Sequence, residues 1–293
     1  MRHMMRSAVL LSVVGVLAGC DLKEVYPTEA PQVAGVRFIN AVPDTAGAFG
    51  MDLRWVDLVE NNHHFRQNFR NGPATTSGVT GATGVQYKPT AAGQRRFKIF
   101  LNDTLQAVAQ VVIKDTTVNL EAGQNYTALL LGEARTGTMR LAFFEEAVAA
   151  PAAGKTAVRV INATGAAIDV RHYKSGTTAP ATATFAGVAA YTASAHLEVD
   201  TATYRYNVQP AGGGTALFAD GTFLVGAQAS SSAGAGGKLD IEAIPGTAVA
   251  GSAVTVIVFP RSTAGARTPQ LPAATWGVPQ GVSVWDRRPP YIQ

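Results

Sequence analysis

The sequence predicts an all-β protein in which two tandem antiparallel β-sandwich domains, Ig-like or prealbumin-like, follow a lipoprotein signal peptide. Three observations carry this prediction. Apolar and polar residues alternate with a period of two, which is typical of strands with one buried face. Gly and Pro interrupt the chain too often for long helices. The segments of the first half recur in the same order in the second half, so we expect two similar sandwiches of short strands.

Residues 1–19 are typical of a secretion signal. Arg2 and Arg6 precede an apolar stretch over residues 7–18, and small residues lead to the cysteine of Leu17-Ala18-Gly19-Cys20. A basic leader, a short apolar region and small residues at the cleavage site define a signal peptide. The 12 residues of the apolar stretch fall short of the roughly 20 that a helix needs to cross a bilayer.

The motif that ends in Cys20 resembles the lipobox of bacterial lipoproteins. The resemblance implies that the Cys20 thiol receives a diacylglyceryl group, that cleavage follows Gly19 and that the acylated cysteine becomes the N-terminus. Two or three acyl chains hold a protein on a membrane almost permanently. We therefore predict a lipid-anchored protein of the bacterial cell envelope, on the outer membrane or the periplasmic side. Because Asp21 directly follows the cysteine, the inner membrane stays an alternative location.

The composition narrows the class of partner. Charged residues make up 15% of the chain, against about 25% in average proteins. The formal charge of +4 includes Arg2 and Arg6, so the mature chain is nearly neutral. The pI is 9.3, but no basic stripe with interleaved aromatic residues occurs, and no nucleic-acid partner is expected. The lone cysteine excludes an internal disulfide.

The predicted domain boundaries follow changes in composition. A segment with Pro27 and Pro31 lacks any periodicity and is expected to be a tether. A second break, Ala149-Ala150-Pro151-Ala152-Ala153-Gly154, is rich in small residues, as linkers between domains are. The prediction is a signal peptide over 1–19, a tether over 20–34, a first sandwich over 35–148, a linker over 149–156 and a second sandwich over 157–293 with a Pro-rich C-terminal segment.

Four segments of the first repeat recur in order in the second. Their offsets differ, as loop insertions would produce, and the conserved order favours duplication over chance similarity in a chain rich in Ala, Thr, Val and Gly. The matched segments are 36–41 with 158–163, 52–54 with 169–171, 84–87 with 187–191, and 122–131 with 250–259.

The strands are expected to differ in burial. Tyr204, Tyr206 and Val208 alternate with polar residues, which predicts a strand with one wet face. Residues 128–131 and 254–259 are apolar on both faces, so they are expected in the middle of sheets that are covered on both sides.

Three segments together resemble domain-of-unknown-function family 4397. They are Val-Arg-Phe-Ile-Asn-Ala-Val-Pro-Asp over 36–44, Gly-Val-x-Tyr over 84–87 and the segment over 120–127 that precedes an apolar strand. The resemblance covers residues 35–146 and, more loosely, 157–260. It implies tandem domains in a secreted or envelope-anchored bacterial protein. The family has no established activity, so the resemblance implies no catalytic residues.

Motifs of known catalytic machinery are absent from the sequence. It contains no nucleophile elbow, zinc-protease helix, phosphate-binding loop or calcium loop. We expect neither an enzyme nor a cofactor. Glu145 and Glu146 are adjacent carboxylates, but neighbours in a strand face apart, so a solvated strand end is expected there rather than the carboxylate pair of a glycosidase.

Two pairs of residues are weak site candidates. His63 and His64, near Asp57, would bind a metal only if a loop brought them together, since neighbours in a strand point to opposite faces. Surface histidines are the alternative, and no metal is expected. Trp276 and Trp285 lie in the Pro-rich final segment, where residues 261–280 read as a loop and 281–286 as a closing strand. The tryptophans either form a ligand-binding edge or fill the second core.

The sequence therefore predicts an envelope lipoprotein with a binding or scaffolding role, without catalysis. The partners expected are the membrane, through the lipid anchor, and an envelope protein or a glycan. An envelope hydrolase that acts on glycans, with an active site built from loops, is the alternative. Purely structural packing within the envelope is a third class.

Overall fold

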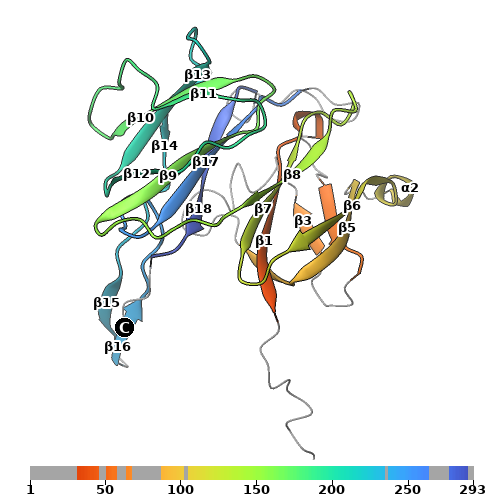
Figure 1. Cartoon of the computed structure of the whole chain (residues 1–293), viewed down its shortest axis with the longest axis horizontal. Coiled ribbons are helices and arrows are strands. Elements are labelled where there is room, and N and C mark those ends of the chain that lie inside the picture. Colours follow the sequence, from red (N-terminus) through yellow and green to blue (C-terminus); the bar gives the residue numbers. More distant parts are fainter. Residues whose placement is uncertain are drawn as a thin grey trace, which may run out of the picture. The chain divides into compact units, whose positions relative to one another are not determined.

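The computed structural model describes residues 32–45, 51–57, 64–67, 87–101, 105–234, 237–263 and 277–289. The chain from Val33 onward forms one compact unit. The predicted all-β class is confirmed: the only helical segments in the described ranges are η1 (Pro43–Thr45) and α2 (Gln106–Ala109) (Figure 1). No helix in these ranges is long and apolar enough to span a bilayer. The predicted signal peptide, including Cys20, lies outside the described residues.

The first half of the compact unit consists of two four-stranded sheets. One, which we call the first junction sheet, has the order β4-β1-β7-β8, and the first outer sheet has the order β3-β2-β5-β6. The strands are β1 (Val33–Asn40), β2 (Met51–Trp55), β3 (His64–Gln67), β4 (Lys88–Ala91), β5 (Gly93–Leu101), β6 (Val112–Leu120), β7 (Asn125–Leu131) and β8 (Arg140–Glu145).

The second half repeats this topology strand for strand. Its junction sheet has the order β12-β9-β17-β18 and its outer sheet β11-β10-β13-β14, while a separate hairpin, β15–β16, is inserted before β17 (Figure 1). The segments matched in sequence thus include the corresponding strands β1 and β9, β2 and β10, and β7 and β17. The strands are β9 (Lys155–Asn162), β10 (Ile168–Lys174), β11 (Phe185–Val188), β12 (Leu197–Asp200), β13 (Tyr204–Pro210), β14 (Phe218–Thr222), β15 (Ser230–Gly234), β16 (Gly237–Ile241), β17 (Ala253–Phe259) and β18 (Gln280–Arg287).

The sequence predicted antiparallel sheets, but each junction sheet contains one parallel pair of strands. The first strand of each half pairs in parallel with the penultimate one, β1 with β7 and β9 with β17. Each of these pairs is connected through the whole outer sheet rather than through a hairpin. A tight turn therefore does not set their relative direction.

Alternate residues of the central strands serve two different cores. In β1, Val36 and Phe38 point into the first sandwich. Ile39, one residue on, belongs to a third cluster that also contains Leu129 of β7 and Ile257 of β17. The third cluster therefore lies between the two halves. The prediction that the apolar strands around 128–131 and 254–259 are covered on both faces is confirmed, because β7 is buried from Tyr126 onward and β17 throughout.

The Tyr206 ring lies against two glycines, Gly221 of β14 and Gly281 of β18, and is 1% exposed. A Cβ atom on Gly281 would lie 2.8 Å from Tyr206 Cε2, and one on Gly221 would overlap the same ring. We expect Gly221→Ala and Gly281→Ala each to lower the free energy of unfolding by about 1–3 kcal/mol, the usual cost of overpacking, in urea denaturation. Because Tyr206→Phe removes the hydroxyl that Gly281 approaches, Gly281→Ala should cost less in a Tyr206→Phe background than in the wild type. Equal costs in both backgrounds would contradict this account.

Candidate functional site

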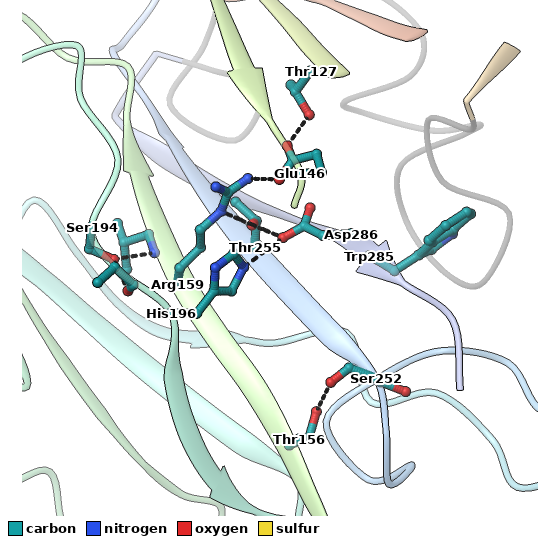
Figure 2. A network of polar contacts seen from close by, with 12 residues as sticks. Thr127, Glu146, Thr156, Arg159, Ser194, His196, Ser252, Thr255, Trp285 and Asp286 are labelled. Atoms are coloured by element: carbon teal, nitrogen blue, oxygen red, sulfur yellow. Dashed lines mark hydrogen bonds and ion pairs between the residues drawn. The ribbon is translucent and has the colours of Figure 1, made fainter. Parts of the chain in front are cut away.

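Four charged side chains meet between the two halves and are removed from water there. They are Arg37 of β1, Glu146 directly after β8, Arg159 of β9 and Asp286 of β18, and none is more than 6% exposed. Arg37 and Arg159 are each two residues before an isoleucine of the third cluster, so in each strand they point to the same face as that isoleucine. We call these four residues the charge cluster; Figure 2 shows three of them, Glu146, Arg159 and Asp286.

In the first half, the strand register assembles one side of the cluster. Arg37 pairs with Thr127 across the parallel ladder, and its Nε donates to Thr127 Oγ1 at 2.8 Å. Thr127 also pairs with Phe144 of β8, which brings Glu146 within reach two residues later. The Thr127 hydroxyl donates to Glu146 Oε1 at 2.5 Å. The threonine thus links the arginine and the carboxylate of its own half.

The second half repeats this arrangement with equivalent residues. Arg159 pairs with Thr255 in the parallel ladder, and its Nε donates to Thr255 Oγ1 at 2.7 Å. The Thr255 hydroxyl donates to Asp286 Oδ2, as Figure 2 shows. Asp286 follows Val284, the cross-strand partner of Thr255, by two residues. Its place is therefore that of Glu146 in the first half.

The two sides of the cluster are joined because each arginine binds the carboxylate that the other half contributes. Arg37 Nη2 donates to Asp286 Oδ1 at 2.6 Å, and Arg159 Nη2 donates to Glu146 Oε2. Each arginine therefore binds the carboxylate of the other half directly and lies 3.5 Å from the carboxylate of its own half. The contact has the pattern of a self-complementary, twofold interface, formed here within one chain.

The environment of the two carboxylates is not the same. Burial alone would raise the pKa of Asp286, but the hydrogen bond from His196 and the charge of Arg159 outweigh it and hold that pKa well below its ordinary value. The His196 Nε2 atom lies 3.3 Å from Asp286 Oδ2. At Glu146, burial and then the charge of Asp286 raise the pKa, against the opposing charges of the arginines. His196 is thus the feature that departs from the twofold pattern.

Aromatic rings cover one side of the cluster. The Arg37 guanidinium lies 4.6 Å from the centre of the Tyr87 ring, and Tyr87 meets Trp285 edge to face at 5.4 Å. The Arg288 guanidinium lies over the Trp285 ring, 4.9 Å from its centre. Trp285 is 8% exposed, so it lies between the halves and does not offer an open ring to a ligand.

The other residues singled out from the sequence are placed as follows. Trp276 and His63 lie outside the described residues, and His64 begins β3. In the described ranges, no group of three or more His, Cys, Asp or Glu side chains could hold a metal ion.

The expectation of a solvated strand end at Glu145 and Glu146 was wrong for Glu146. Glu145 is exposed, but Glu146 is 6% exposed because the second half covers it. Arg37 and Arg159 lie in the matched segments 36–41 and 158–163, and no role was predicted for either residue. The available signal was an arginine at the same position of an otherwise apolar strand in both copies, since an unpaired buried charge is too costly to retain.

The two halves also share one end of the compact unit. The strands β1, β7, β9 and β17 all run toward this end. The Thr263 amide donates to the Pro43 carbonyl at 3.1 Å, and the Arg140 guanidinium lies 4.0 Å from the centre of the Tyr191 ring. These contacts join loops of the two halves. We call this the loop end; its described loops are 41–45, 105–111, 132–139, 163–167, 189–195 and 211–217.

Comparison with protein families agrees with the resemblance noted from the sequence. Residues 34–173 match the model of DUF4397, a domain of unknown function. The match spans the first half together with β9 and nearly all of β10. None of the curated proteins compared matches the chain.

Proposed function

We propose that this chain, whose residues 34–173 match DUF4397, is a lipid-anchored lipoprotein of the bacterial envelope that binds or scaffolds a protein or glycan partner and does not catalyse a reaction. The observation that carries the proposal is the charge cluster, because it fixes two sandwiches to each other so that their loops lie at one shared end.

The direction of β1 supports this role. An anchor at Cys20 would connect to the sandwiches at Val33, the first residue of β1. Pro43, of the loop end, lies beyond the other end of the same strand. The attachment point and the loop end therefore lie at opposite ends of β1, which leaves the loop end accessible to a partner. Loops on a rigid β scaffold are a common place for recognition.

The loop end also carries exposed apolar side chains. Leu105, which precedes α2, is 56% exposed, and Val111, which follows it, is 49% exposed. Since Leu105 and Val111 lie in the connection between β5 and β6, two paired strands of the first outer sheet, these side chains are presented on a preorganised scaffold. Preorganisation reduces the ordering cost of binding. The loop end is accordingly the surface at which we place the partner.

The test uses the lipidated protein with three variants. Cys20→Ala should move the protein from the membrane fraction to the soluble fraction. Val111→Asp should lower retention of envelope glycan or protein by about tenfold, as loss of a central apolar contact does. Val56→Asp is the matched control, since Val56 is 44% exposed and follows β2 at the other end of the first sandwich.

Two results would overturn the proposal. Equal loss of retention in Val56→Asp and Val111→Asp would remove the loop end as the binding surface. Turnover of glycosidic, ester or peptide substrates that one carboxylate substitution abolishes would establish the hydrolase instead.

A further inference from the structure

The strand β6 lies at the edge of the first outer sheet, and among the described strands only β5 pairs with it. Its nine residues make it the longest edge strand in the described ranges. Edge strands that avoid pairing are commonly short, kinked or interrupted by proline. β6 contains neither Pro nor Gly, and its ladder with β5 is unbroken from Leu120 to Lys114. The equivalent strand of the second half, β14, has five residues, a register shift and a positive φ of 57° at Asp220.

The backbone groups of alternate β6 residues point away from β5. The Val56 amide donates to the Arg96 carbonyl at 2.9 Å, so the backbone groups of Arg96 face β2. Residues opposite each other in an antiparallel pair either exchange both hydrogen bonds or point these groups away from each other. Thr117 lies opposite Arg96, and Asp115 lies opposite Lys98, the next residue of the same alternation. The N–H and C=O groups of Thr117 and Asp115 therefore face the open edge, and both residues are exposed.

The solvent-facing side of this edge carries a defined arrangement of charges. The Asp115 carboxylate accepts from Nε and Nη2 of Arg96 at 2.9 Å and 2.7 Å, and Lys98 Nζ lies 3.4 Å from its Oδ2. The Arg96 side chain is 56% exposed, and only the small side chain of Thr117 separates it from the open edge. A strand added beside β6 would lie two strand spacings, about 10 Å, from the Arg96 backbone. The long arginine side chain can bind a carboxylate there.

We propose that β6 pairs antiparallel with β6 of a second copy of this chain, in the twofold register centred on Thr116. In that register the partner's Asp115 lies opposite Thr117, where Arg96 reaches it, and the partner's Arg96 reaches Asp115 in the same way. The backbone groups that face the open edge are then the ones that form hydrogen bonds between the copies. The first outer sheets of the two copies join into one continuous sheet.

The same charges disfavour the neighbouring twofold registers. A pairing centred on Asp115 places two aspartates directly opposite each other, which is destabilising. A pairing centred on Thr117 aligns Arg96 with the partner's Arg96 across two threonines. In the register centred on Thr116, Lys114 lies opposite the partner's Val118, so no like charges lie opposite each other. Charge complementarity therefore selects a copy of β6 as the added strand. The inference goes beyond the function proposed above and does not rest on it.

One strand pair forms a small interface, and interfaces of that class are weak. The association is therefore measured by sedimentation equilibrium at high concentration, on the purified mature chain with Cys20→Ser to prevent acylation. We expect a concentration-dependent dimer. Thr117→Pro removes an N–H that faces the partner but none that bonds β5, so it should raise the dissociation constant by about tenfold or more. Thr117→Ala keeps that N–H and is the matched control, which should dimerise as the wild type does.

An exchange of charges tests the register. Asp115→Arg alone and Arg96→Glu alone should each raise the dissociation constant by about tenfold, because each places like charges on the two sides of Thr117. When the two variants are mixed, the arginines of one chain meet the carboxylates of the other at both places, so a heterodimer of wild-type affinity should form. Unchanged thermal unfolding of each variant shows that the fold is intact.

The inference is wrong if the wild-type chain stays monomeric across the accessible range, or if Thr117→Pro dimerises as well as Thr117→Ala. A mixture of the charge variants that dimerises no better than its components also overturns it, since the effect would then come from general charge rather than from the register. Binding of a different protein to this edge, without self-association, would likewise contradict the pairing of β6 with itself.

Discussion

Replacing Arg37 with alanine is expected to lower the free energy of unfolding by about 3–5 kcal/mol, the usual cost of removing one partner of a buried ion pair. The guanidinium is completely buried and donates to Thr127, Asp286 and the carbonyl of Trp285, and at 3.5 Å to Glu146. Without it, the Asp286 carboxylate loses its short contact with the first half while it stays buried. Urea denaturation followed by circular dichroism measures the change.

The twofold pattern of the cluster supplies a second variant and the control. Arg159→Ala removes the equivalent donor and should cost a similar amount, because Arg159 binds Thr255 and Glu146 in the same way. Arg96→Ala removes an arginine that bonds Asp115 in the first outer sheet, where the side chains are 56% and 35% exposed, and it should cost no more than about 1 kcal/mol. A loss of less than about 1 kcal/mol in Arg37→Ala would show that the cluster does not join the halves.

The cluster and the apolar third core have different roles at the junction. The apolar residues, among them Ile39 and Phe259, supply burial that is not directional. Burying charges gains little or no net stability, because desolvation offsets the attraction. What the charge cluster adds is geometry, since two arginines satisfy two carboxylates only when β1 and β9 lie at the same level. We infer that it fixes the relative position of the sandwiches.

The sequence predicted those features of the fold that depend on local pattern. The alternation in 204–209 and the apolar run in 126–131 identify strands and their burial because side-chain direction in a strand has a period of two. The topological correspondence of the two halves also follows from matched segments, such as 36–41 with 158–163. The parallel pairing of β1 with β7 did not follow, because no turn links them.

The charge cluster was beyond the reach of local pattern. Arg37 and Asp286 are 249 positions apart in the chain, and no property of either segment indicates that they meet. The surroundings of the Trp285 ring likewise depend on residues that are distant in the sequence. Whether that ring faced solvent or a core depended on the first half, which contributes Tyr87 to the contact.

Asp286→Asn should destabilise the protein more than Glu146→Gln, although the two carboxylates hold equivalent places. The pKa of Asp286 is lowered in the folded state, so its ionised form stabilises the fold. The pKa of Glu146 is raised, mainly by burial, so ionised Glu146 is less well accommodated. At pH 7 we expect a loss of about 3–5 kcal/mol for Asp286→Asn and about 1–2 kcal/mol for Glu146→Gln.

The same shifts give the two variants opposite responses to acid. The contribution of Asp286 is complete above its unfolded pKa of about 3.9 and is lost as the pH falls from there toward its lower folded pKa. The raised pKa of Glu146 acts the other way: its ionised form weakens the fold above the folded pKa, and protonation relieves this as the pH falls through that value.

Glu146→Gln, which keeps Asp286, should therefore lose stability more steeply between pH 5 and pH 3 than Asp286→Asn does. The two curves of unfolding free energy should converge at low pH, and His196→Ala, which removes the one contact that Glu146 lacks, should narrow their difference at pH 7. Parallel curves would show that the two carboxylates are equivalent and that His196 has no part in the cluster.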